Sequence, residues 1–229
     1  MLYGILADIH GNIYALEAVL SELEKLGVTE LLIAGDFVGY YYYPDKVIDL
    51  IRNWKHTAVL GNHDILYLKC LSGKLHVDQV PKQYGSGLLR ALETISMDNI
   101  EWLKNLPFLK SCKLGDTKNL LCHGSPNSND QYLYPDTEIS KFKEFKLRGY
   151  DAVIVGHTHY PMFRKCNEVV YFNPGSVGQP RNKNPNAHFG LFDSSNNTFM
   201  HNSVEYNTEL IINDCDFYDP KLSNLKKYF

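Results

Sequence analysis

The sequence predicts an α/β protein, a four-layer α/β/β/α sandwich of two mixed sheets, and three observations support this. Short apolar runs alternate with longer amphipathic runs over residues 2–60, a pattern typical of β-α-β units with parallel strands. The second half of the chain contains many further short runs with strand character. No linker or low-complexity tract separates the two halves, so we expect residues 1–229 to form one domain.

The amino-terminal part begins with alternating strands and helices. Three apolar runs predict buried strands: Leu2–Ala7, Leu31–Ala34 and Thr57–Leu60. The first helix between them ends at Gly27, and the second opens with Pro44. Right-handed crossovers place these strands side by side in a parallel sheet. Residues 65–107 are expected to be mostly helical, with breaks near residues 71–74 and Pro81.

The carboxyl-terminal part is predicted to be rich in strands. Two of them, Leu109–Leu114 and Asn119–Cys122, are joined by a turn at Gly115-Asp116. A helix is expected over Thr137–Leu147. Five more strands follow: Ala152–Val155, Met162–Lys165, Val169–Phe172, Phe189–Phe192 and Thr198–Val204. The polar and aromatic end, residues 214–229, has no pattern that assigns it to an element.

Composition excludes several classes of protein. The net charge is −3 with no basic surplus, so no nucleic-acid-binding surface is indicated. No apolar run reaches the roughly 20 residues of a membrane helix, and we expect no membrane association. The five cysteines are odd in number and form no C-x-x-C pair, which predicts reduced thiols and a cytoplasmic location. Whether the protein is a homo-oligomer stays open.

Five short motifs carry side chains that suit a metal site. They are, in chain order, Asp8-Ile9-His10, Gly35-Asp36, Gly61-Asn62-His63-Asp64, His123-Gly124 and Gly156-His157-Thr158-His159. Each follows a predicted buried strand, so the five motifs can converge on one edge of a sheet. Each motif alone is also compatible with an ordinary surface turn. Their joint occurrence, each at a strand end, favours one hydrolytic site with two metal ions.

The residue types indicate which metals fit. Asp8 and His10 are two positions apart, which puts both on one side of an extended segment, and His157 and His159 have the same spacing. The two carboxylate oxygens of Asp36 allow it to bridge two ions, one oxygen to each. Mixed nitrogen and oxygen ligands suit Mn, Fe, Zn, Co or Ni better than Ca or Mg.

The ordered motifs resemble those of the calcineurin-like metallophosphoesterase superfamily, and within it the small bacterial and archaeal phosphodiesterase branch. The resemblance spans about residues 1–205 and includes the segment 173–181. It implies two metal positions that share Asp36. One would also be held by Asp8, His10 and His159, and the other by Asn62, His123 and His157. His63 resembles the family histidine that contacts the phosphate and assists the leaving group, and Asp64 resembles the acid that orients it.

The resemblance implies an enzyme, a phosphoesterase that hydrolyses phosphodiester or nucleotide substrates with a metal-bound hydroxide. Manganese is the favoured metal. Two alternatives remain. The first alternative is a phosphomonoesterase, including a protein phosphatase. The second is a binding scaffold of the same fold that has no catalytic activity. A scaffold should purify without stoichiometric metal, which separates it from the enzymes.

Two further features are open to more than one interpretation. Tyr40–Tyr43 follow Gly39 and form a loop in which relatives more often carry glycine. These tyrosines either stack on a nucleobase or serve packing or a subunit contact. Arg181 either binds a substrate phosphate or lies at the surface. No cap domain is evident, so an open site is expected.

Overall fold

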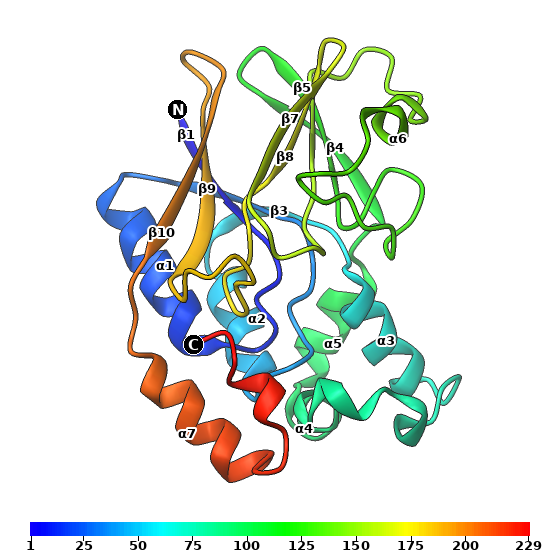
Figure 1. Cartoon of the computed structure of the whole chain (residues 1–229), viewed down its shortest axis with the longest axis vertical. Helices are drawn as coiled ribbons and strands as arrows, with labels where there is room; N and C mark the ends of the chain where they lie inside the picture. The colour runs from blue at the N-terminus through cyan, green and yellow to red at the C-terminus, as the bar shows by residue number, and fades with distance from the viewer.

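Two five-stranded sheets form the centre of the molecule (Figure 1). The computed structural model describes residues 1–229. One sheet has the strand order β10-β9-β1-β2-β3 and the other β4-β5-β6-β8-β7. Each contains both parallel and antiparallel pairs, so the prediction of two mixed sheets is confirmed.

The first sheet contains the three parallel strands expected from the amino-terminal pattern and two antiparallel strands from the end of the chain. Its strands are β1 (Leu2–Leu6), β2 (Glu30–Ile33), β3 (Lys55–Ala58), β9 (Ala187–Asp193) and β10 (Thr198–Val204). β3 begins earlier than the apolar run indicated, because its first three residues pair with β2 while remaining partly exposed. Apolar character alone therefore placed the third strand about two residues too late.

The second sheet is built from the strand-rich second half. Its strands are β4 (Leu109–Leu114), β5 (Thr117–Cys122), β6 (Ala152–Ile154), β7 (Met162–Cys166) and β8 (Val169–Asn173). Strands β5, β6 and β8 run parallel. The carboxyl ends of β1, β2, β5 and β6 all carry predicted site motifs.

Helices cover the outer faces of both sheets. The helices of the first half are α1 (Ile13–Lys25), α2 (Pro44–Arg52), α3 (Asn62–Leu71), α4 (Gly87–Thr94) and α5 (Met97–Lys104). The largest apolar cluster joins these helices to the first sheet. Asn12 caps α1 by accepting a hydrogen bond from the Ala15 amide, and Pro44 opens α2 as predicted. No helix combines the length and apolar character that a bilayer crossing requires.

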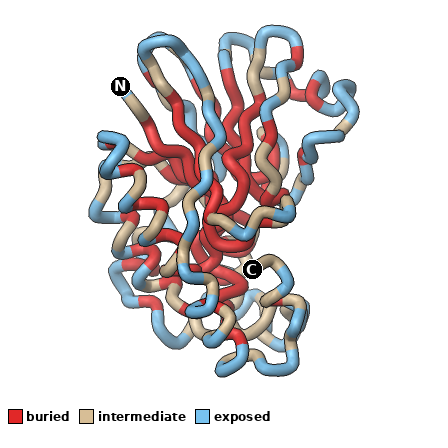
Figure 2. Tube along the Cα trace, turned by 60° about the vertical axis from the view of Figure 1, so that its left-hand side comes forward, coloured by how far each residue is buried: buried red, intermediate tan, exposed pale blue.

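The two sheets pack face to face through a separate apolar cluster. Figure 2 shows this buried centre in red. Ile5, Leu32 and Phe192 enter it from the first sheet. Leu121 and Phe172 enter it from the second, and Phe172 is completely buried. The five cysteines are all free, as expected from their number and spacing.

One expected helix needs correction, and a segment left unassigned is now placed. The helix predicted over Thr137–Leu147 is only α6 (Ile139–Lys143). Phe142 in this helix and Phe145 just after it pack on the Tyr171 ring. The end of the chain, residues 214–229, had no clear pattern, and its first residues belong to α7 (Thr208–Tyr218).

Helix α7 and the residues after it pack against the tyrosine run. Tyr41 donates a hydrogen bond to the Leu225 carbonyl at 3.1 Å, and Tyr42 donates one to the Asp219 carboxylate at 3.0 Å. Tyr41 and Tyr42 are almost completely buried. Packing within the chain is therefore the role of both residues.

The Phe172→Ala variant is expected to lose about 3–5 kcal/mol of unfolding free energy, because it leaves a cavity between the two sheets. The matched variant Phe217→Ala changes a side chain that is 77% exposed and should shift stability by less than about 0.5 kcal/mol. Urea unfolding of both variants measures the difference. Equal stabilities would show that the contact between the sheets is not a principal source of stability.

Candidate active site

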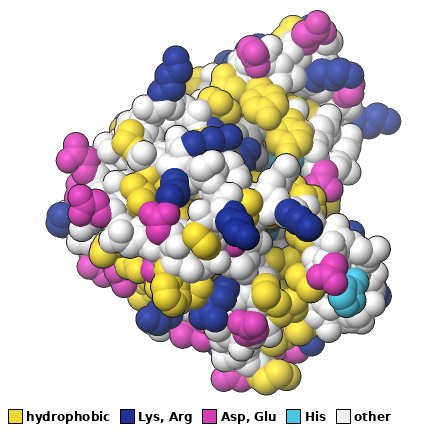
Figure 3. All heavy atoms as spheres, turned by 60° about the horizontal axis from the view of Figure 1, so that its bottom comes forward, with side chains coloured by type: hydrophobic (Ala, Val, Ile, Leu, Met, Phe, Trp, Pro, Cys, Tyr) yellow, Lys and Arg dark blue, Asp and Glu magenta, His cyan; other side chains and the backbone are white.

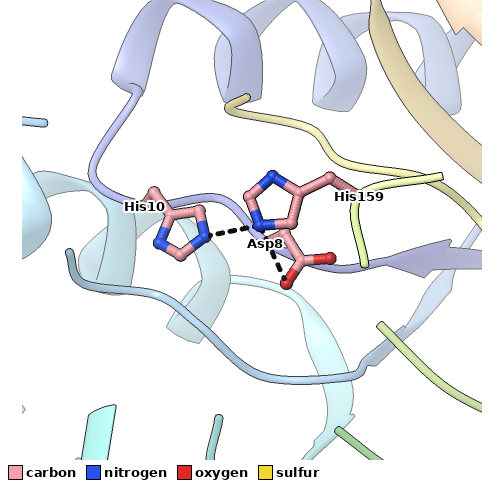
Figure 4. A group of neighbouring side chains, drawn as sticks. All are labelled: Asp8, His10 and His159. Atoms are coloured by element: carbon pink, nitrogen blue, oxygen red, sulfur yellow. Dashed lines mark hydrogen bonds and ion pairs between the residues drawn. The ribbon is translucent and has the colours of Figure 1, made fainter. Parts of the chain in front are cut away.

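The predicted ligand side chains meet at one end of the two sheets. Three groups have ligand atoms that all lie within 4.8 Å of one another: Asp8, His10 and His159; Asp8, Asp36 and His123; and His10, Asp36 and His63. Asp8 and His10 come from one motif and His159 from another, and the three side chains turn toward one another (Figure 4). All the residues of these groups are buried, so their charges and lone pairs lie in a region with little water.

Five of the predicted ligands have a left-handed backbone. They are Asp8, His10, Asp36, His157 and His159, with φ between 52° and 68°. Non-glycine residues seldom adopt this conformation, which costs on the order of 1–3 kcal/mol per residue. Neighbouring backbone hydrogen bonds hold it, such as those from the Asp8 amide to Gly35 O and from the His10 amide to Asp36 O. The loops thus keep strained geometry where the side chains must converge.

The rings of His10 and His159 present two lone pairs to each other. His10 Nδ1 lies 3.0 Å from the Val38 carbonyl and His159 Nδ1 lies 2.7 Å from the Gln179 carbonyl. A carbonyl only accepts, so both Nδ1 atoms carry hydrogen. Burial, the largest cause for each ring, lowers the pKa of both histidines well below the usual value, which keeps the rings neutral. The Nε2 atoms, 3.2 Å apart, are then both acceptors, an arrangement that a cation between them would stabilise.

Asp36 lies between the two halves of the cluster. Its Oδ2 is 3.5 Å from His10 Nε2 and 3.3 Å from His123 Nε2. Its Oδ1 accepts a hydrogen bond of 2.8 Å from the His63 amide. Oδ2 thus faces a histidine on each side, while Oδ1 is held by the backbone at the start of α3. That each oxygen serves one ion stays a prediction.

Asn62 joins the other histidines of the set. Its Oδ1 is 2.9 Å from His123 Nε2 and 3.0 Å from His157 Nδ1. His123 Nδ1 contacts the Ala34 carbonyl, which orients the ring from the opposite side. An amide oxygen between two imidazoles adds a ligand without adding negative charge.

The charges of the buried carboxylates are incompletely balanced by the protein. Burial raises the pKa of Asp8 to about 7, opposed by His123 and reinforced by the charge of Asp36. Burial lowers the pKa of His123, but the charge of Asp36 and a hydrogen bond to it outweigh this and raise the value to about 9. Asp8 Oδ2 is buried without any hydrogen-bond partner. Divalent cations fit this donor set, since they would replace the proton that His123 otherwise carries.

His63 lies in an aromatic enclosure beside the ligands. Its ring centroid is 4.9 Å from that of His10, 5.0 Å from Tyr40 and 4.8 Å from Tyr84. Burial lowers its pKa, while the charge of Asp36 opposes this effect. Gly39 permits the close approach, because a Cβ there would lie 2.9 Å from His63 Nδ1 and its φ of 134° disfavours other residues.

Asp64 has a different environment from the one expected. Its carboxylate was predicted to orient His63, but four backbone N–H groups occupy both of its oxygens. They belong to Gly61, Asp36, Phe37 and Val38, at 2.8 to 3.1 Å. Asp64 therefore connects the loop after β2 to the start of α3.

Arg181 and several residues without a motif border the cluster. Arg181 donates hydrogen bonds to Tyr40 Oη at 3.1 Å and to Gln179 Oε1 at 2.8 Å. The Tyr132 ring lies 4.0 Å from that of His157. Sequence reasoning missed Tyr84 and Tyr132, which lie in segments without a chemical motif. Gln179 was within the noted segment 173–181 but received no role.

A layered α/β sandwich with buried carboxylate, amide and imidazole groups at its strand ends defines a metal-dependent hydrolase. Residues 1–197 match the calcineurin-like phosphoesterase superfamily domain. The chain belongs to this superfamily and is a metal-dependent phosphoesterase.

Individual relatives cover most of the chain. The protein MJ0912 of Methanocaldococcus jannaschii is 29% identical over 222 residues, which are 90% of this chain and 88% of that protein. The phosphodiesterase YfcE of Escherichia coli K12 is 29% identical over 198 residues, 82% of this chain and 85% of YfcE. The crystal structure of PH1004 from Pyrococcus horikoshii superposes with a TM-score of 0.86 at 25% identity, covering 99% of this chain and 96% of PH1004.

Asp64→Asn should destabilise the metal-free protein by about 3 kcal/mol, because the amide nitrogen cannot accept hydrogen bonds and two buried N–H groups lose their partner. Denaturant unfolding in the presence of a chelator measures this loss. Asp136→Asn, at an exposed position, is the matched control and should be neutral. An unchanged Asp64→Asn midpoint would contradict the structural role of the four bonds.

Proposed function

We propose that the protein is a phosphodiesterase with two divalent metal ions, acting on phosphodiester or nucleotide substrates. The observation that carries the proposal is the convergence of imidazole lone pairs on both sides of Asp36 Oδ2. We further propose that residues 1–229 act as one domain, since the carboxyl-terminal residues pack on the tyrosine run beside the site.

The two proposed ligand sets would share Asp36, which lies between the histidines of both sets. One set is completed by Asp8, His10 and His159. The other is completed by Asn62, His123 and His157. A mixed set of imidazole, amide and carboxylate ligands suits Mn, Fe, Zn, Co and Ni. Among these, manganese is the favoured metal on the resemblance to the superfamily.

Two divalent ions bound there supply positive charge for the phosphate and lower the pKa of a water nucleophile. The side chains around them then position the substrate. His63 offers a ring N–H to a phosphoryl oxygen, and the anionic substrate favours protonation of the ring, from which the leaving oxygen takes a proton. Arg181 contributes a second cationic contact for the substrate. Asp64 positions the loops of the site indirectly, through the hydrogen bonds that its carboxylate accepts from the backbone.

A diester is favoured over a monoester by two considerations. YfcE, which aligns over most of this chain, is named a phosphodiesterase. The site also extends into a neighbouring pocket, which leaves room for the second ester group. A phosphomonoesterase, including a protein phosphatase, remains the alternative within the enzymes.

The purified protein is expected to contain about two divalent ions per chain. Chelation should abolish hydrolysis of bis(p-nitrophenyl) phosphate, and Mn²⁺ should restore it because the ligands remain in place. Metal analysis and the release of p-nitrophenol measure both effects, with p-nitrophenyl phosphate as the comparison monoester. Full activity without metal would refute the proposal, and faster hydrolysis of the monoester would favour the alternative.

His63→Ala should lower kcat on the aryl diester by a factor on the order of 10², because a positioned donor to the reacting phosphate is lost. Metal content should be retained, since the assigned ligands are all other residues. His76→Ala, at an exposed histidine, is the control and should keep wild-type kcat. Loss of metal in step with activity would make His63 a ligand.

A further inference from the structure

A pocket of about 320 Å³ lies beside the candidate metal centre. Tyr40, Tyr84 and Gln179 line the part of the pocket next to the cluster. Lys227 and Tyr228, from the end of the chain, line another part of it. The pocket thus combines loops of the part that matches the family, residues 1–197, with a segment that lies beyond it.

The lining residues contact the site directly. The Tyr40 ring is 4.7 Å from His10, and the Gln179 carbonyl accepts a hydrogen bond from His159 at 2.7 Å. Tyr132, also in the lining, packs on His157. A substrate whose phosphate lies at the cluster would therefore extend into this pocket.

The pocket carries positive charge without a balancing carboxylate. Arg181 and Lys227 are its charged residues. The guanidinium of Arg181 bonds only neutral oxygens, those of Tyr40 and Gln179, and its buried Nε has no partner. The ammonium of Lys227 lies 4.7 Å from the Tyr228 ring centre. On the face drawn in Figure 3, lysine and arginine side chains lie among hydrophobic and acidic ones.

The two cations lie at different depths. Arg181 bonds the Tyr40 hydroxyl at 3.1 Å, and the Tyr40 ring centroid lies 4.7 Å from that of His10, so Arg181 lies next to the cluster. Lys227 is exposed at the surface of the pocket. A ligand with one phosphate at the cluster and a second anionic group farther out would meet both.

The segment that carries Lys227 is held in place before any ligand binds. Leu225 is fully buried and its carbonyl accepts the Tyr41 hydroxyl. Asn224 donates a hydrogen bond of 2.9 Å to the Gln83 carbonyl. The pocket wall is therefore preorganised, which reduces the entropic cost of binding.

We propose that this pocket is a subsite for a second, non-scissile phosphate of a nucleotide diester, bound by Arg181 and Lys227. The four tyrosines of the lining would contact the sugar and base. The inference rests on the proposed function and extends it to a substrate class: nucleotide diesters with an additional phosphate.

Calorimetry of the Mn²⁺-loaded protein with thymidine monophosphate and thymidine bisphosphate tests the subsite without turnover. The wild type should bind the bisphosphate roughly tenfold more tightly. Lys227→Gln should reduce this preference roughly fivefold, and Arg181→Gln should reduce it by at least as much. Lys221→Gln, an exposed lysine of the same segment outside the pocket, should keep the wild-type preference.

Hydrolysis of bis(p-nitrophenyl) phosphate is measured on the same preparations, so that failure of the proposed function is seen separately. Absence of a preference for the bisphosphate in the wild type would overturn the subsite, even in an active diesterase. An equal preference in Lys227→Gln and Lys221→Gln would overturn it as well. The p-nitrophenyl diester of thymidine monophosphate serves as a substrate, with and without a phosphate on its free sugar hydroxyl. The substrate with the additional phosphate should have the higher kcat/KM.

Discussion

The interaction on which the site depends is the capture of four backbone amides by the buried carboxylate of Asp64. It ties the loop after β2 to the amino-terminal end of α3. The same helix end then binds Asp36 Oδ1 through the His63 amide. With Oδ1 held in this way, Oδ2 is directed at the imidazoles of His10 and His123. Backbone donors at a helix start suit this task because their partial positive charge stabilises two adjacent carboxylates.

The strained loops follow from the same requirement. Side chains from separate strand ends reach a common point only if the chain turns sharply after each strand, and left-handed residues provide that turn. Gly61 shows how close the loops come, since a Cβ there would lie 2.0 Å from Asp36 Oδ1. The buried sheets and their packing supply the stability that such conformations cost.

The sequence predicted the layered fold and the side chains that cluster, because both follow from local features. Apolar runs mark strands, and polar motifs at their ends mark the edge where parallel strands finish. The role of Asp64 was not visible, since its partners are backbone amides that every residue possesses. Tyr84 and Tyr132 reach the site from segments with no chemical motif, so only the tertiary packing identifies them.

Helix α7 was also not visible in the sequence, because it is held by tertiary contacts, some of them with the tyrosine run. Its partners are far away in the chain: Tyr14 and Tyr43 both donate to the Asp214 carboxylate. Packing and ligand contact were alternative roles for all four tyrosines. In the structure, different tyrosines of the run have different surroundings. Tyr41 and Tyr42 turn toward the carboxyl-terminal segment, whereas Tyr40 lies between His63 and Arg181.

The consecutive tyrosines thus couple two parts of the molecule. Their phenols hold the segment that completes the pocket, and the first of their rings faces His10. A glycine loop at this position would have neither the hydroxyls to bind the segment nor the surface to bury it. The tyrosine run and the carboxyl-terminal segment are therefore parts of one structural feature, which gives a phosphoesterase scaffold an additional wall beside its site.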